Sequence, residues 1–421
     1  MLAALHTPLA AWTIVGLGTA GVIMRPFEWP EFVWAGAAAI LLVVLGLLSP
    51  GQAWKGISDG TDVYMFLVGM MLLSELARQE GLFDWMAARA AKMAKGSATK
   101  LFTLVFAVGT IITVFLSNDA AAVVLTPAVA AVAKTAKAKD PLPYLFICAF
   151  IANAASFVLP ISNPANLVIY GSQMPPLLQW LPRFAIPSLL SILATYAALR
   201  WTQRSALQQE ISADIEQPEL STAGKLAAAG IIGTAVILLL SSAFDLQLGL
   251  PTLLAGVATA MLVLTKSESS VKDVLKNVSW GVIPLVAGLF VLVEALQVTG
   301  VVQLLATELQ ALLHESVTLA VWISGVGLAV GSNLVNNLPA GLVAGRVVEL
   351  AKVPDAVRSA VLIGVDIGPN LSVTGSLATI LWLTALRREG QQVGAWTFLK
   401  LGAVVMPQAL ILALAAAIFI N

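Results

Sequence analysis

Long stretches without a single charged residue recur from one end of this chain to the other. They are Ala35–Ala53, Leu101–Asn118, Pro141–Pro182, Phe184–Leu199, Leu226–Phe244, Leu246–Thr265, Ser316–Gly345, Ile367–Leu386 and Leu401–Asn421. A helix needs about 20 mostly apolar residues to cross a bilayer, so windows of this kind are typical of membrane spans. Only 11% of the residues are charged, whereas soluble domains have roughly 25%. The sequence therefore predicts an all-α polytopic membrane protein.

The longest hydrophilic stretch, residues 203–225, divides the chain into halves with the same order of parts. Each half has three apolar segments, an amphipathic stretch, an apolar hairpin interrupted by amides, a segment broken by Pro or Gly, and a final span. The apolar segments are expected at 9–25, 32–50, 61–77, 183–201, 226–244, 249–265, 279–298 and 397–420, the hairpins at about 98–136 and 316–352, and the broken segments at about 143–176 and 356–386. We therefore predict about ten transmembrane helices in two repeats of five, covering residues 1–202 and 226–421.

The distribution of Lys and Arg predicts that the second repeat is inverted. An odd number of spans in each half reverses the direction in which the next half begins. If the linker 203–225 is cytoplasmic and each hairpin returns to its starting side, then of the 23 Lys and Arg only Lys55, Arg183, Arg346, Lys352 and Arg358 lie on the other face. This asymmetry follows the positive-inside rule. It predicts that both termini face away from the cytoplasm, whether the hairpins are re-entrant or cross the membrane twice.

Uncharged polar residues gather in the two hairpins and the two broken segments. Irregular backbone survives in a membrane only where protein or water surrounds it, and matching breaks in two halves point to a transporter's binding site. A single such residue usually caps a helix or bonds to a neighbouring helix, but matched clusters in both halves favour binding. The predicted binding residues are Asn118, Asn163, Asn166, Asn336, Asn337, Asn370, Thr374, Ser376 and Thr379.

Two carboxylic acids, Asp119 and Asp366, lie among these amides. An ionised Asp at the centre of a membrane helix costs about 2.5–3.5 kcal/mol, so each is a functional candidate. Because burial favours the uncharged form of a carboxyl group, both are candidates for proton coupling, Asp119 first. The alternative for either residue is a helix cap. Glu75 and Glu294 occupy equivalent positions in the third span of each half, where an interfacial or scaffold role is expected.

The remaining composition excludes several kinds of site. The single cysteine, Cys148, allows no internal disulfide, and the isolated His6 and His314 argue against a metal site or another cofactor. A formal net charge of zero gives no basic patch for nucleic acid. Tryptophans near the predicted span ends, among them Trp180 and Trp201, are expected to form an interfacial belt.

Four motifs, "LSNDAAAVVLTP", "PISNPANLVIY", "NNLPAGL" and "GVDIGPNLSVTGSLATILWLTALRREG", resemble the bacterial arsenite efflux permeases of the ion transporter superfamily. The resemblance runs essentially end to end. It implies proton-driven export of trivalent arsenic and antimony, and a scaffold domain beside a transport domain with two re-entrant hairpins and two broken helices. It also implies a site built from Asn118 and Asp119, Asn163 and Asn166, Asn336 and Asn337, and residues 366–379. A soluble arsenite-stimulated ATPase subunit and a second copy of the chain are candidate partners.

The substrate implied by this resemblance suits the predicted lining. Arsenite near neutral pH is mainly an uncharged trihydroxide, which amides and hydroxyls can bind, whereas a multi-thiolate site needs more than one cysteine. We therefore expect a secondary transporter that exchanges this solute for protons by alternating access. A sodium/proton antiporter of the same superfamily is the alternative, although a cation site usually needs more charged oxygens. An intramembrane enzyme is a remote alternative, because both histidines lie outside the polar clusters and there is no HExxH motif.

Overall fold

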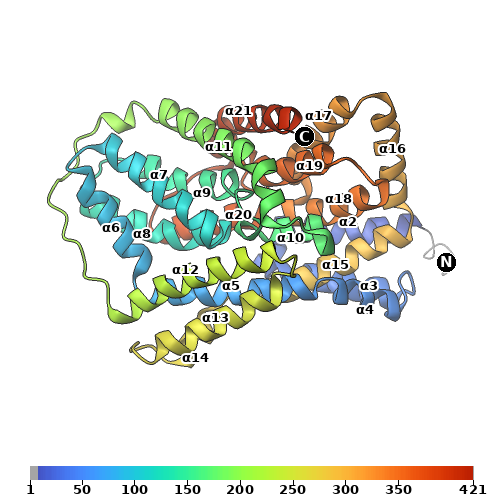
Figure 1. The fold of residues 1–421 in the computed structure, drawn as a ribbon, viewed down its shortest axis with the longest axis horizontal. Coiled ribbons are helices and arrows are strands. Elements are labelled where there is room, and N and C mark those ends of the chain that lie inside the picture. Colours follow the sequence, from blue (N-terminus) through green and yellow to red (C-terminus); the bar gives the residue numbers. More distant parts are fainter. Residues whose placement is uncertain (1–7, 421) are drawn as a thin grey trace.

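The computed structural model describes residues 8–420, and every regular element in that range is helical (Figure 1). In the first half the elements are α2 (Pro8–Met24), η1 (Pro26–Glu28), α3 (Glu31–Val44), α4 (Pro50–Asp59), α5 (Thr61–Gln79), α6 (Leu82–Ala94), α7 (Ala98–Phe115), η2 (Ala120–Val124), α8 (Leu125–Thr135), α9 (Leu142–Ala154), η3 (Pro160–Ser162), α10 (Pro164–Tyr170), η4 (Gly171–Gln173), α11 (Leu177–Thr202) and η5 (Ala206–Gln208). In the second half they are α12 (Thr222–Ala243), α13 (Gly249–Leu264), α14 (Val271–Asn277), α15 (Val282–Val298), α16 (Val301–Glu315), α17 (Val317–Val335), α18 (Asn337–Ala351), α19 (Asp355–Ile367), η6 (Gly368–Leu371), α20 (Leu377–Arg388) and α21 (Ala395–Ile420).

The fold class predicted from the apolar windows is confirmed. Within residues 8–420, six helical stretches are long and apolar enough to cross a bilayer, and the pair α4–α5, bent by 46°, makes a seventh. Helices α2, α3, α9 and α13 are apolar but shorter, at 10–17 residues. The protein is therefore a multi-pass α-helical membrane protein, while the count of ten spans stays a prediction. The order of elements from α2 to α11 recurs from α12 to α21, which supports the division into two repeats.

The helices form two layers (Figure 1). The scaffold layer contains α2–α5 and α12–α15, in which α5 packs against α13 and α15 against α3. The hairpin layer contains α7–α11 and α17–α21, in which α11 packs against α21 and α17 against α19. Helices α6 and α16 lie at opposite ends of the molecule and connect the two layers. Each of these two helices begins directly after a glycine with positive φ, Gly81 at 70° and Gly300 at 88°.

Glycines let the scaffold helices α5 and α13 approach closely. A Cβ added to Gly69 would lie 2.3 Å from the Thr252 carbonyl oxygen, and one added to Gly256 would lie 2.7 Å from the Gly69 carbonyl oxygen. Association in lipid depends on such close packing, since the apolar surroundings provide no hydrophobic drive between helices. The backbones of α5 and α13 are therefore in direct contact, and there is no space for a side chain between them at Gly69 and Gly256.

We expect Gly69→Val to destabilise the protein by about 1–3 kcal/mol or more, because the backbone of α13 cannot yield as a side chain would. Gly36→Val is the matched control, since the space around this helical glycine is open for 4 Å. Thermal unfolding of the detergent-solubilised protein measures the difference. Equal melting temperatures for the two variants would contradict the close packing described above.

Two expectations from the sequence are wrong in detail. The predicted segment 32–50 ends early, because α3 stops at Val44, Gly46 takes a φ of 69° and Ser49 starts α4 with a capping box to Gln52. Trp180 does not belong to an interfacial belt. Its side chain is fully buried, and its Nε1 donates to the carbonyl oxygens of Phe157 at 3.3 Å and Val158 at 3.2 Å. Residue His6 and the predicted location of the N-terminus lie outside the described residues.

Candidate functional site

A cavity of about 500 Å³ lies between the two layers, at the C-terminal end of α5. The linker approaches this end, where Ser221 Oγ donates to Glu80 Oε2 at 3.5 Å, so we call it the linker-side cavity. The scaffold layer supplies α5 and the start of α15, and the hairpin layer supplies η2 and α20. The polar side chains among its lining residues are Ser74, Glu75, Arg78, Ser117, Asp119, Asn277, Ser279, Thr384, Arg388 and Glu389.

Asp119 lies in this cavity at the tip of the first hairpin. Helix α7 ends at Phe115, and the chain turns into a π-helical segment that begins at Ala120. Ser117 Oγ accepts from the amide of Ala120 at 3.2 Å, and Asn118 Oδ1 accepts from the amide of Asp119 at 2.9 Å. These two side chains satisfy free amides at the helix start, so the Asp119 carboxylate is not needed as a cap. Within residues 8–420 no hydrogen bond or ion pair reaches that carboxylate.

The amides of the first broken segment hold its backbone together. Asn166 is fully buried, and its Nδ2 donates to the carbonyl oxygens of Ser156, Leu159 and Pro160 at 2.9, 3.2 and 3.3 Å. The neighbouring Asn163 Oδ1 caps α10 by accepting from the amide of Ala165 at 3.0 Å. Carbonyls freed by the break are thus satisfied by side chains in place of water.

Hydrogen bonds join the two broken segments across the middle of the hairpin layer. Asn163 Nδ2 donates to Asp366 Oδ1 at 2.8 Å, and Asp366 is fully buried. Asn153 Nδ2 donates to Asn370 Oδ1 at 3.0 Å, while Asn370 Nδ2 donates to the carbonyl oxygen of Phe150 at 3.0 Å. The halves of the chain therefore meet through paired amides and a single acid.

The second hairpin tip attaches to the second break in a similar way. Asn336 caps α18 and takes a φ of 72°, and its Nδ2 donates to the Thr374 carbonyl oxygen at 3.3 Å. The amide of Asn337 donates to the Gly375 carbonyl oxygen at 2.8 Å. Just beyond, Ser376 Oγ caps α20 by accepting from the amide of Thr379 at 3.1 Å, and the Thr379 side chain is fully buried.

The structure thus brings most of the sequence-predicted residues into one buried junction of interrupted elements. Only Asp119 among them lines the linker-side cavity. Asp119 and Thr374 are half-buried, and the other predicted residues are buried. Four of the six predicted amides already use their side-chain donors, Asn163 on the carboxyl group of Asp366 and Asn166, Asn336 and Asn370 on backbone carbonyls, so in this conformation the junction positions the hairpin tips. Direct binding of a solute by these residues stays a prediction.

Sequence reasoning gave Glu75 only an interfacial or scaffold role, and it missed several other side chains of the linker-side cavity. Glu75 is buried, and its carboxylate accepts from Arg78 Nε at 2.8 Å, from Arg78 Nη2 at 2.6 Å and from Gln79 Nε2 at 2.6 Å. The spacing of Glu75 and Arg78 by three residues on one helix face was the available signal. Ser117 directly precedes the amide and acid of the first tip. Nothing in the local sequence singles out Thr384, which faces the cavity only because α20 packs beside η2.

Comparisons with known proteins identify the family. The profile of the CitMHS family, described as a citrate transporter, matches residues 20–367. The arsenical pump membrane protein of Escherichia coli (strain K12) is 27% identical over 404 residues, covering 90% of this chain and 91% of that protein. The corresponding protein of Yersinia enterocolitica is 26% identical over 415 residues, covering 91% and 92%. An uncharacterized transporter of Mycobacterium tuberculosis is 29% identical over 400 residues, covering 90% of each chain.

Solved structures show the same fold at low sequence identity. The Alcanivorax borkumensis YdaH transporter has a TM-score of 0.55 at 17% identity, over 87% of this chain and 86% of that one. Neisseria gonorrhoeae MtrF has a TM-score of 0.53 at 15% identity, over 87% and 82%. The resemblance to the arsenite permeases, first drawn from four motifs, is confirmed by the curated relatives. The chain is a membrane transporter and not an enzyme, and it belongs to the CitMHS family.

Proposed function

We propose that this protein exports arsenic(III), as its neutral trihydroxide, and antimonite from the cytoplasm in exchange for protons. The observation that carries the proposal is the unpaired carboxylate of Asp119, held at a hairpin tip inside a cavity between two layers. The relatives named arsenical pump membrane protein, matched over about nine tenths of the chain, supply the substrate. The proposal places the linker in the cytoplasm of a bacterium and the protein in its inner membrane.

The lining of the linker-side cavity suits a small uncharged polyol. Hydroxyls of Ser74, Ser117 and Thr384 are spaced among apolar side chains, where each can exchange a hydrogen bond with an O–H group. Thiolate coordination does not enter the proposal, since Cys148 is fully buried and lies outside this lining. Among residues 8–420 there is no group of three His, Cys, Asp or Glu side chains placed to hold a cation. This gives the exchange of protons for a neutral solute more support than sodium transport.

The two acids have different roles in the proposed cycle. Asp119 binds a proton from the outside and releases it toward the cytoplasm. Its carboxylate carries an exposed charge only while the substrate enters or leaves the cavity. Asp366 has no access to the linker-side cavity and accepts a hydrogen bond from Asn163. We therefore assign Asp366 to positioning the two breaks, and Asp119 to coupling. Exchange of one neutral solute for a proton makes each turnover electrogenic.

We expect Asp366→Asn to keep at least about half of the proton-driven transport, because asparagine retains an oxygen that can accept from Asn163. Asp366→Leu is the contrasting variant, since it removes that acceptor and leaves the Asn163 amide buried without its partner. Initial rates of arsenite uptake into inside-out vesicles compare the two. Loss of transport in Asp366→Asn with normal folding would move the coupling role to Asp366.

The test of the proposed function is uptake of arsenite into inside-out vesicles under an imposed pH gradient, acid inside. Uptake should require the gradient and should not respond to sodium. A second set of vesicles, monitored for sodium-dependent changes of internal pH, examines the alternative antiporter. No arsenite uptake under any gradient would overturn the proposal.

A further inference from the structure

A second, smaller cavity lies at the opposite end of α5 from the linker-side cavity. It measures about 210 Å³ and is polar, with Asp59, Asp62, Gln247, Arg346, Glu349 and Arg358 in its lining. We call it the distal cavity. It also lies between the two layers, since Asp59 and Asp62 belong to the scaffold layer and Arg346 and Glu349 to α18 of the hairpin layer.

The two cavities occupy equivalent places in the two halves. The linker-side cavity is lined by the first hairpin and by α20, the second part of the second broken segment. The distal cavity is lined by the second hairpin and by α10, the second part of the first broken segment. The larger of the two is at the linker side, so the space beside α5 narrows from the C-terminal end of this helix toward its N-terminal end.

Only about one helical turn separates the two cavities. On α5, Phe66 lines the linker-side cavity and Val63 lines the distal one. On α10, Pro164 lines the linker-side cavity and Leu167 lines the distal one. One turn of helix rises about 5.4 Å. The cavities are therefore consecutive segments of one path between the layers, interrupted by a thin apolar barrier.

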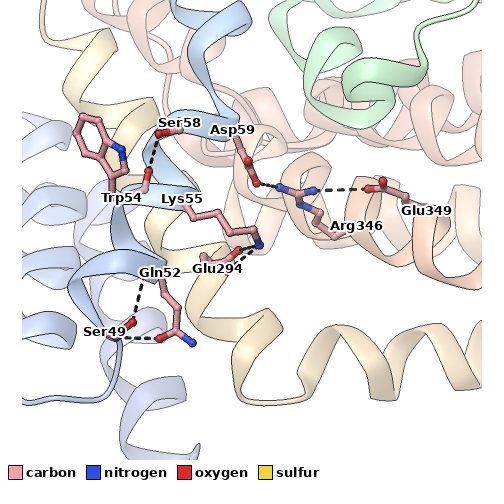
Figure 2. A network of polar contacts seen from close by, with 9 residues as sticks. All are labelled: Ser49, Gln52, Trp54, Lys55, Ser58, Asp59, Glu294, Arg346 and Glu349. Carbon is pink, nitrogen blue, oxygen red and sulfur yellow. Dashed lines mark hydrogen bonds and ion pairs between the residues drawn. The ribbon is translucent and has the colours of Figure 1, made fainter.

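An ion pair bridges the layers at the distal cavity (Figure 2). Arg346 Nη2 contacts Asp59 Oδ2, and Arg346 Nη1 lies 3.6 Å from Glu349 Oε2 on its own helix. Asp59 is the last residue of α4, so the pair ties the end of a scaffold helix to α18. The neighbouring Lys55–Glu294 pair, at 3.0 Å, joins α4 to α15 and stays within the scaffold layer. Asp59 thus lies at the end of a helix that a second ion pair holds to the rest of the scaffold layer.

We infer that the distal cavity is the exit for the transported solute and that the Asp59–Arg346 pair is its latch. The inference rests on the proposed function in that an exit needs a transported solute. While the pair is formed, the hairpin layer is held against the scaffold and the exit is shut. Separation of Arg346 from Asp59 enlarges the distal cavity. It exposes charged and amide groups that form hydrogen bonds with a hydroxylated solute as it leaves.

Thiol labelling tests the latch without any substrate. Cys148 is fully buried, so nearly all of the measured labelling comes from a cysteine introduced elsewhere. Leu342→Cys reports on the distal cavity, because Leu342 lines it one turn before Arg346 and is 3% exposed. Ser74→Cys reports on the linker-side cavity. A charged, membrane-impermeant maleimide is applied to right-side-out and to inside-out vesicles, so the result does not depend on the assumed orientation.

In the Leu342→Cys background, Asp59→Asn and Arg346→Gln should each speed labelling by about threefold to fivefold, the range for a partly exposed ion pair of up to about 1 kcal/mol. Ser74→Cys labelling should slow in the same variants. Arg346→Lys and the exchanged pair Asp59→Arg with Arg346→Asp should return both rates toward their starting values. The control is Asp355→Asn, which breaks the 2.6 Å pair between Arg183 on α11 and Asp355 on α19 within the hairpin layer. It should change neither rate.

Unchanged Leu342→Cys labelling in Asp59→Asn and Arg346→Gln would overturn the latch, as would an equal increase in Asp355→Asn. The labelling rates could change as expected in vesicles that take up no arsenite. That result would leave the exit assignment in place and overturn the proposal that arsenite is the substrate. The two proposals therefore fail separately.

Discussion

Asp119→Asn is expected to reduce proton-driven arsenite uptake into inside-out vesicles by about tenfold or more, to the background of empty vesicles. Asparagine has almost the same shape and preserves the hydrogen-bonding character of the hairpin tip, but it cannot bind and release a proton. Because Ser117 and Asn118 already cap the following helix, the substitution should leave the fold intact. A loss of transport would therefore report on coupling and not on structure.

Two comparisons sharpen this result. Asp119→Glu keeps an acid at the tip and should retain part of the pH-dependent uptake, whereas Ser117→Ala removes one hydroxyl and one cap and should affect stability more than coupling. Counterflow, in which labelled arsenite exchanges against unlabelled arsenite without a gradient, should survive in Asp119→Asn. Full gradient-driven export by Asp119→Asn would contradict the role given to this residue.

Asn166→Leu should destabilise the protein by about 2–3 kcal/mol, because the buried carbonyls of Ser156 and Pro160 lose their donor and each unsatisfied group costs about 1 kcal/mol or more, whereas the carbonyl of Leu159 keeps the amide of Ser162 at 3.1 Å. The side chain has no access to the linker-side cavity, so any loss of transport should parallel the loss of folded protein. Thermal unfolding and the monodisperse fraction after detergent extraction measure this together with uptake per folded molecule.

The control for Asn166 is Asn277→Leu. Asn277 is also an amide that donates to a carbonyl, that of Asp273 at 3.0 Å, but it is exposed, so water replaces the lost bond. This variant should shift the melting temperature by a degree or two at most, and only its melting temperature is compared, because Asn277 also lines the linker-side cavity. An Asn166→Leu protein that melts like the unsubstituted protein would show that the break does not depend on this amide.

The interruptions were predictable because Pro and Gly act locally. Pro160 and Pro164 remove amides from any continuous helix, and Gly368 with Pro369 does the same in the second half. Helix α19 ends at Ile367, directly before Gly368, whereas α9 ends at Ala154, before Pro160 is reached. The apolar windows likewise predicted an all-helical membrane protein, since a bilayer admits few other solutions.

The direction in which individual side chains point was not predictable in the same way. Asn118 and Asp119 are adjacent, yet the first caps a helix and the second lies in the cavity, and that choice depends on how η2 packs against α5 and α20. The burial of Trp180 depends equally on the distant break at Phe157. The amides predicted to bind the solute mainly hydrogen-bond to backbone groups, namely those that the helix breaks leave without a partner in the helix.

In the proposed transport cycle, helices α6 and α16 limit how far the two layers can move relative to each other. Within residues 8–420, the chain passes from one layer to the other only through these helices and the linker. Helices α6 and α16 are 13 and 15 residues long, or about 20 and 22 Å. Each helix is jointed to the scaffold at a glycine whose conformation other residues rarely adopt, Gly81 and Gly300. In the proposed cycle, sliding of the hairpin layer against the scaffold layer would therefore be a rotation of α6 and α16 about these glycines, with nearly the same radius at both ends of the molecule.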